Sequence, residues 1–170
     1  MSGAPRRRPP LRFALALLPA VLAVGGCGFR LQGSAPLPRS IALVRIETSD
    51  TESDFYFGLR KALLAAGTRI DEHGNDPSAT IIHVLTDTVG QRVLTVSALN
   101  VPTEYELSYA IKFSVTASGR DLIEPESHVL VRDYNFSESA LLAKQRETRI
   151  FSEALAHDLV NVVMRRLATL

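Results

Sequence analysis

The chain of 170 residues contains a single cysteine, Cys27, so an internal disulfide is excluded and the fold rests on packing. Signatures of common catalytic sites are also missing, since the sequence has no P-loop, no G-x-G-x-x-G and no G-x-S-x-G. The histidines are scattered, without an HExxH or an i, i+4 pair that would suit zinc. These absences indicate a protein that is not an enzyme and that needs no metal or dissociable cofactor.

Acidic residues are absent from the first 26 positions, which hold four arginines: Arg6, Arg7, Arg8 and Arg12. Taking those four from the 19 basic residues of the whole chain leaves 15 against 18 acidic residues, a net charge of −3. A protein with this balance is not a cationic nucleic-acid binder, so we expect no nucleic-acid partner. Its length and its 46% hydrophobic content indicate one domain with a substantial core.

A hydrophobic run long enough to cross a bilayer is missing from the N-terminus. The apolar segment 13–24 covers 12 residues, whereas a spanning helix needs about 20. A basic stretch followed by a short apolar one is typical of a secretory signal peptide. The segment ends in Val24-Gly25-Gly26-Cys27, and an aliphatic residue, two small residues and a cysteine form a bacterial lipobox. The sequence therefore predicts that residues 1–26 are a signal peptide, removed by cleavage before Cys27.

Cys27 is then the predicted site of lipidation, carrying an S-diacylglycerol and an N-acyl chain. Each buried methylene contributes about 0.8 kcal/mol, so two or three acyl chains make a permanent anchor. The next residue is Gly28, whereas an aspartate there retains a lipoprotein in the inner membrane in enteric-type sorting. We expect an outer-membrane lipoprotein whose folded domain faces the periplasm. The alternative is a plain secretory signal followed by a chance cysteine.

The remaining sequence is interpreted as a lipidated tether at 27–39 and a single domain at 40–170. Apolar residues at helical spacing predict a helix over 54–66, with Thr51 or Ser53 as its N-cap and Gly67 just past its end. Strict alternation of apolar and polar residues predicts a long strand over 103–118 with one buried and one wet face. Further strands are expected at 41–47, at 80–89 with 91–99 continuing past a bend at Gly90, and at 127–136 after a turn over 119–125.

A long C-terminal helix follows, capped within 137–139. Its predicted apolar stripe comprises Leu142, Ile150, Phe151, Ala154, Leu155, Leu159, Val162, Val163 and Leu167. The order β-α-β-β-β-α predicts an α+β fold, a two-layer sandwich. In it a four-stranded mixed sheet carries both helices on one face, and its other face is rich in Ser, Thr, Glu and Lys.

Two basic features are candidates for contact with an anionic ligand. One is the segment 144–149, which contains Lys144 and Arg146, at the start of the last helix. The other is Arg92, in the bent region of the second strand. On composition alone, a solvated helix face and a lone surface arginine are the favoured explanations of the two features.

The mature chain begins with Cys27-Gly-Phe-Arg-Leu-Gln-Gly33 followed by Leu37-Pro38, and Thr103-Glu-Tyr105 opens the alternating strand. In these motifs it resembles the LptE family of lipopolysaccharide-assembly lipoproteins. The resemblance is closest over Arg132-Asp-Tyr-Asn-Phe136, Ala140-Leu-Leu-Ala-Lys144 and the terminal Arg165-Arg166-Leu167. These motifs occur in the family's order behind the lipobox, so the resemblance covers essentially the whole mature chain.

The resemblance implies that the protein binds the β-barrel LptD one to one and plugs it, helping the barrel assemble and insert lipopolysaccharide into the outer leaflet. The family's basic residue in the "LAK" stretch falls on Lys144, which implies a lipopolysaccharide contact there, with Arg146 close by. A second basic residue that some members carry before the "TEY" strand is missing from 97–103, and Arg92 is its substitute candidate. The alternative function is a lipid-anchored regulator of a cell-wall synthase.

Overall fold

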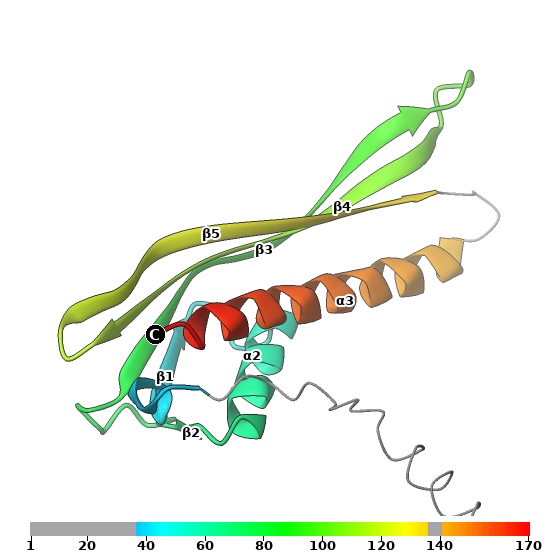
Figure 1. The fold of residues 1–170 in the computed structure, drawn as a ribbon. Coiled ribbons are helices and arrows are strands. Elements are labelled where there is room, and N and C mark those ends of the chain that lie inside the picture. The colour runs from blue at the N-terminus through cyan, green and yellow to red at the C-terminus, as the bar shows by residue number, and fades with distance from the viewer. Residues whose placement is uncertain (1–36, 136–140) are drawn as a thin grey trace, which may run out of the picture. The chain divides into compact units, whose positions relative to one another are not determined.

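The computed structural model describes residues 37–135 and 141–170. The predicted signal peptide, Cys27 and most of the predicted tether lie outside the described residues. The elements follow one another from the short 3-10 helix η2 to the C-terminal helix α3 (Figure 1). They are η2 (Arg39–Ile41), β1 (Leu43–Thr48), α2 (Asp54–Ala65), β2 (Arg69–Ile70), β3 (Thr80–Val96), β4 (Pro102–Ala117), β5 (Arg120–Asn135) and α3 (Leu141–Leu167).

The strands form one mixed sheet in the order β2-β1-β3-β4-β5. β1 and β3 are parallel, while β3, β4 and β5 form an antiparallel meander, as the element order predicts. Both helices lie on the same face of the sheet (Figure 1). The two-layer α+β sandwich is therefore confirmed, with one correction, because the sheet has five strands rather than four.

The additional strand, β2, is only two residues long and pairs parallel to the outer side of β1. The bonds at its two ends run from the Arg69 N–H to the Ala42 carbonyl at 3.0 Å and from the Asp71 N–H to the Val44 carbonyl at 2.8 Å. Two residues are too few to produce an alternating pattern, so sequence periodicity does not reveal this strand.

The ends of α2 agree with the sequence prediction. Ser53 is the N-cap, and its hydroxyl accepts a hydrogen bond from the Tyr56 N–H at 3.0 Å. At the other end Gly67 adopts φ +87°, a left-handed conformation that costs glycine little. The N–H groups of Gly67 and Thr68 bond back to the carbonyls of Leu64 and Leu63, each at 3.0 Å. This is the Schellman arrangement, which stops the helix where the glycine lies.

The core lies between the helices and one face of β4. Five apolar residues of the alternating strand are nearly inaccessible to solvent, and Tyr105 at its start is partly buried. The five are Leu107, Tyr109, Ile111, Phe113 and Val115. Against them pack Phe55, Leu59 and Leu63 of α2, and Leu155, Leu159, Val163 and Leu167 of α3. Leu37, at the end of the predicted tether, already packs against this core.

The second hairpin turns earlier than the sequence prediction. Ser118 and Gly119 have φ values of 51° and 74°, as the two-residue turns that match strand twist require. β5 therefore begins at Arg120, so the predicted turn over 119–125 is wrong. Pro125 is accommodated because β5 is an edge strand and its register with β4 shifts between Phe113 and Val115. β3, in turn, continues through Gly90 as one strand.

Helix α3 fully buries the part of its predicted stripe made of Leu155, Leu159, Val163 and Leu167, and Phe151, Ala154 and Val162 are half-buried. Ile150 does not belong to the buried face. Ile150 is 61% exposed, whereas Ala156 and Val160, outside the predicted stripe, are buried. Leu142 belongs to α3, but its side chain lies outside the described ones. The difference arises because α3 also packs against α2 (Figure 1), which widens and rotates its buried face.

The sheet face turned away from the helices is polar over β3 and β4 and apolar at its β5 margin. In register across the strands lie Gly90, Ser108 and Val131, followed by Thr88, Ala110 and Val129. Val129 and Val131 are both more than half exposed. The predicted Ser/Thr-rich face is thus present, with two valines added beside the free edge of β5.

Two alanine substitutions in α3 distinguish the observed buried face from the predicted one. Leu159→Ala, at a fully buried position, is expected to lower the free energy of unfolding by about 2–5 kcal/mol, because it leaves a cavity. Ile150→Ala is expected to change it by less than about 0.5 kcal/mol, because the side chain is exposed. Urea denaturation followed by circular dichroism measures both. Equal losses would contradict this placement of α3.

Candidate functional site

The structure places the basic residues predicted from the sequence on two different layers. Lys144 lies in the N-terminal part of α3, with its side chain outside the described ones. Arg146, two residues further on, is exposed, and no acidic residue pairs with it within the described part of the chain. Arg92 lies on β3, in register with Glu106 on the sheet face that the helices leave open. Arg92 and Arg146 are therefore not brought together.

The guanidinium of Arg92 is already occupied by Glu106. Its Nε lies 2.8 Å from Oε1 of Glu106, and its Nη2 donates to Oε2 at 2.9 Å. This two-point contact raises the pKa of Arg92, mainly through the hydrogen bond to Glu106. A paired guanidinium attracts a second anion less than a free one does.

An aromatic cluster positions the start of α3 over the sheet. Tyr134 of β5 stacks on Tyr105 of β4 with ring centroids 5.7 Å apart, and packs against Phe151 of α3 at 5.8 Å. Its hydroxyl accepts a hydrogen bond from Gln91 Nε2 at 2.6 Å and lies 3.3 Å from the Thr148 hydroxyl. Tyr134 thus links β3, β4, β5 and α3 at one point. Its contact on the helix, Thr148, comes four residues after Lys144 in the sequence.

Arg132 is a basic residue of this region that sequence reasoning quoted only as part of a motif. Its guanidinium carbon lies 5.0 Å from the centroid of the Phe151 ring, a cation–π contact. The side chain belongs to the helix-facing side of β5, because Arg132 is in register with the buried Leu107. The sequence alone would have placed the Arg132 side chain on this face only if the register of β5 against β4 had been known.

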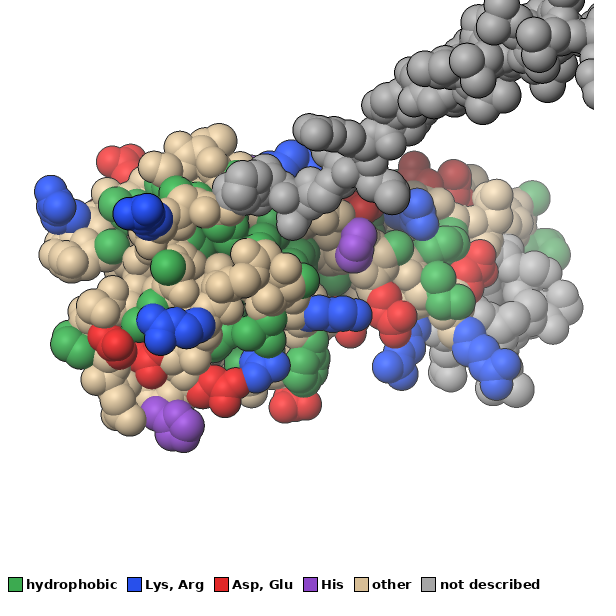
Figure 2. Space-filling view, turned by 60° about the horizontal axis from the view of Figure 1, so that its bottom comes forward, with side chains coloured by type: hydrophobic (Ala, Val, Ile, Leu, Met, Phe, Trp, Pro, Cys, Tyr) green, Lys and Arg blue, Asp and Glu red, His purple; other side chains and the backbone are tan. Residues whose placement is uncertain are grey.

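The other end of α3 is held by an ion pair. Arg166 donates from Nε and Nη2 to Oε1 of Glu126 on β5, at 2.9 and 2.7 Å. The pair lowers the pKa of Glu126 and raises that of Arg166, in both cases chiefly through these hydrogen bonds. Figure 2 shows basic and acidic side chains interspersed over one face of the molecule, with hydrophobic side chains between them.

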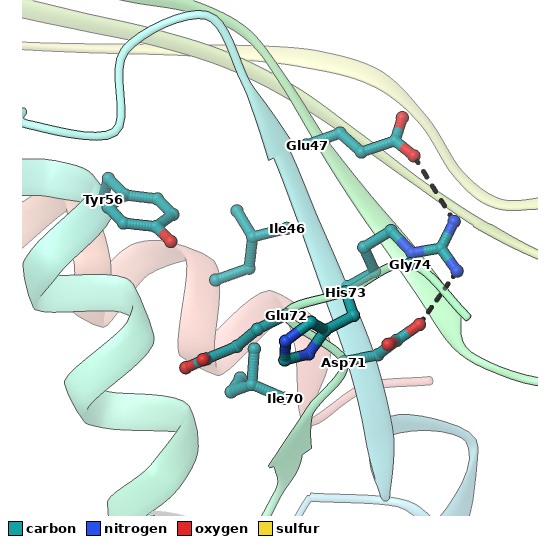
Figure 3. Close-up of a pocket in the computed structure, with 9 residues that line it drawn as sticks. Ile46, Glu47, Tyr56, Ile70, Asp71, Glu72, His73 and Gly74 are labelled. Carbon is teal, nitrogen blue, oxygen red and sulfur yellow. Dashed lines mark hydrogen bonds and ion pairs between the residues drawn. The ribbon is translucent and has the colours of Figure 1, made fainter. Parts of the chain in front are cut away.

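A cavity of about 600 Å³ lies beside the outer edge of β1, past the end of β2. One wall is apolar and comes from Ile46, Tyr56 and Ile70, which Figure 3 shows on the helix side of β1. The other wall is charged and contains Arg45, Glu47 and Asp71. The sequence does not predict this cavity, because part of its lining comes from the loop after β2.

The charged wall is organised by Arg45. Its Nη2 donates to Asp71 Oδ2 at 2.9 Å and to the Asp76 carbonyl at 3.3 Å, while Nη1 lies 3.9 Å from Glu47. Asp71 also accepts hydrogen bonds from the N–H groups of Asn75 and Asp76. The hydrogen bond from Arg45 is the main cause that lowers the pKa of Asp71 from 3.8 to about 2.

Within residues 37–135 and 141–170, no group of three or more histidine, cysteine, aspartate or glutamate side chains is arranged to hold a metal ion. No helix in these ranges is both long and apolar enough to cross a membrane.

Comparison with known proteins assigns the chain to a family. The sequence model of the family described as LptE, lipopolysaccharide-assembly, matches residues 39–167. The chain belongs to the LptE family. The matched region runs from η2 to the last residue of α3. As an LptE-family protein it belongs to the non-enzymatic lipoproteins of lipopolysaccharide assembly, which work in the cell envelope.

Curated relatives carry the same family name. The LPS-assembly lipoprotein LptE of Pectobacterium atrosepticum is 24% identical over 158 residues, which are 93% of this chain and 85% of the relative. The LPS-assembly lipoprotein LptE of Yersinia enterocolitica is 22% identical over 148 residues, 87% of this chain and 71% of the relative.

Solved structures of lipoproteins share the fold of this LptE-family chain. Rare lipoprotein B from Shewanella oneidensis matches with a TM-score of 0.65 and 21% identity, over 75% of this chain and 94% of that one. Lipoprotein B from Nitrosomonas europaea matches with a TM-score of 0.67 and 22% identity, over 83% of this chain and 90% of that one.

The Arg45–Asp71 contact predicts a pH dependence of stability. Because the folded-state pKa of Asp71 is about 2, below its ordinary 3.8, this carboxylate stabilises the fold above pH 3.8 and progressively less as the pH falls towards 2. Asp71→Asn is expected to lower the urea midpoint at pH 7, and the difference from wild type should shrink between about pH 4 and pH 2. Asp121→Asn, at an exposed position, is the control, and its urea midpoint is expected to equal that of the wild type at each pH.

Proposed function

We propose that this LptE-family protein binds an LptD-type outer-membrane β-barrel one to one, sits inside it as a plug, and assists both barrel assembly and the insertion of lipopolysaccharide into the outer leaflet. The observation that carries the proposal is the family match over residues 39–167, which spans nearly every element of the domain. The relatives in this family are named for lipopolysaccharide assembly.

The surface of the domain supports a position inside a wide barrel. The interior of large outer-membrane barrels is polar. On the sheet face that the helices leave open, the Arg92–Glu106 ion pair shares the surface with Ser108 and, further along the strands, with Thr88 and the exposed Lys112. Because Arg92 and Glu106 are paired and short hydroxyl groups share the face with them, these two residues can meet a polar wall without either charge being buried uncompensated.

The proposed anchor is the acylated Cys27, which holds the protein in the outer membrane. The segment between Cys27 and η2 is short, about a dozen residues, and an extended chain advances at most about 3.6 Å per residue. The domain is thereby kept close to a partner in the same membrane. A regulator of a cell-wall synthase has to reach the peptidoglycan, which a short tether does not favour.

For lipopolysaccharide we propose Lys144 and Arg146 as contacts, with Arg92 in a lesser role. Lipid A is a phosphorylated, multiply acylated amphiphile, so it needs cations beside apolar groups. Arg146 is exposed on α3, five residues before Phe151, whose ring contacts Tyr134. Arg92 is held by Glu106, and binding a phosphate there means sharing or breaking that pair.

Co-purification tests the partner. The tagged, full-length lipoprotein is isolated from detergent-solubilised outer membrane, and the bound proteins are identified by mass spectrometry. The expected result is a large LptD-type barrel at about one to one. Recovery of a cell-wall synthase in place of a barrel would overturn the proposal in favour of the regulator.

A charge reversal tests the lipopolysaccharide contact. Lys144→Asp is expected to weaken binding of purified lipopolysaccharide by about tenfold or more, because a hydrogen bond to a charged group contributes about 1.5–3 kcal/mol. Arg165→Asp, an exposed position near the other end of the same helix, should bind as wild type does. Arg92→Gln is expected to show a smaller loss than Lys144→Asp. Unchanged binding by a normally folded Lys144→Asp variant would remove this residue from the site.

A further inference from the structure

The outer edge of β1 is only partly covered. Successive residues of a strand direct their main-chain groups to opposite edges, and the carbonyls of Ala42 and Val44 face β2. The N–H and C=O of Ile46 therefore face the same edge. β2 has ended at Ile70, and the last bond across the pair goes from Asp71 to Val44. Within the described residues, no main-chain bond continues this ladder to Ile46.

The cavity beside Ile46 lies where an added strand would run, and Glu72, His73 and Gly74 of the loop after β2 complete its lining. It extends the line of β2 along β1, with the apolar wall of Ile46, Tyr56 and Ile70 on the helix side and Glu47 on the other side (Figure 3). Side chains of an extended peptide point alternately to the two faces of a sheet. One side chain in two would therefore lie against the apolar wall, and the next would lie near Glu47.

The charge of the cavity indicates which side chains of an added strand would suit the positions near Glu47. Asp71 is bound by Arg45, and Glu72 is bound by Arg60. Glu47 is held less closely, since its carboxylate is 3.9 Å from Arg45 and 3.1 Å from His83 Nδ1, and its side chain is 48% exposed. The carboxylate with the loosest cationic partner thus faces the open space, where it suits a lysine or arginine.

The opposite edge of the sheet, formed by β5, is less suited to an added strand. β5 contains Pro125, which has no N–H, at an irregularity of the ladder, and charged side chains are frequent along it. Prolines, bulges and charges discourage strand addition at an edge. β1 has no proline over Leu43–Thr48.

We propose that the β1 edge is a docking site for an extended segment of a protein partner. The segment adds as a strand beside Ile46, in continuation of β2, and carries apolar residues alternating with basic ones. Its main chain pairs with the free groups of Ile46, an apolar side chain contacts Tyr56 and Ile70, and a basic side chain contacts Glu47. This strand addition is independent of the lipopolysaccharide contacts on α3 and of whether the partner barrel binds.

A synthetic peptide tests the site directly. The full-length lipoprotein in non-ionic detergent is titrated with an acetylated, amidated peptide of alternating valine and lysine. Hydrogen exchange is then followed by mass spectrometry. The expected result is saturable binding that slows exchange over residues 45–48 and leaves the β5 segment unchanged. Protection confined to β5, or no saturable binding, would overturn the proposal.

Two controls separate strand addition from charge attraction. The same peptide methylated on alternate main-chain nitrogens lacks the donors of its pairing edge, so its binding should be abolished without any change in the protein. Glu47→Lys is expected to weaken binding by about fivefold, the range of an exposed ion pair, whereas Glu124→Lys on β5 should have no effect. Equal binding of the methylated peptide would contradict the proposal even if Glu47→Lys weakened it.

Discussion

The burial of one face of β4 is the constraint on which the other elements depend. β4 is paired on both sides, by β3 and by β5, so its polar main-chain groups are satisfied within the sheet. Its apolar side chains must then be covered from one direction, and each fully buried large one contributes about 1.5–3 kcal/mol. α2 and α3 supply this cover, and their mutual packing leaves the opposite sheet face free.

This arrangement separates three surfaces on one small domain. The N-terminal part of α3 contains Lys144 and the exposed Arg146, and Phe151 of the same helix contacts Tyr134. The open sheet face presents hydroxyl groups and the paired Arg92 and Glu106. The edge of β1 presents the free main-chain groups of Ile46 beside a cavity. The three surfaces share a core but no side chains, so each can be altered by substitution without removing the others.

Much of the fold was predictable because its signals are local. The alternation over 103–118, the Ser53 cap and the Gly67 stop each depend on residues within one element, and the structure confirms all of them. The misplaced features depend on contacts between elements. β2 exists only as an addition to β1. The early start of β5 depends on pairing with β4, and the exposure of Ile150 depends on how α3 meets α2.

By itself the sequence determined the α+β class, the order of the main elements and the membership of the LptE family, because patterns and motifs survive without coordinates. It also named Lys144, Arg146 and Arg92 as basic candidates. Only the tertiary structure decided that Glu106 neutralises Arg92 from the neighbouring strand and that Arg45 and Asp71 wall a cavity at the β1 edge. The two members of each pair lie far apart in the chain, and they come within bonding distance only because β3 pairs with β4 and because the loop after β2 runs beside β1.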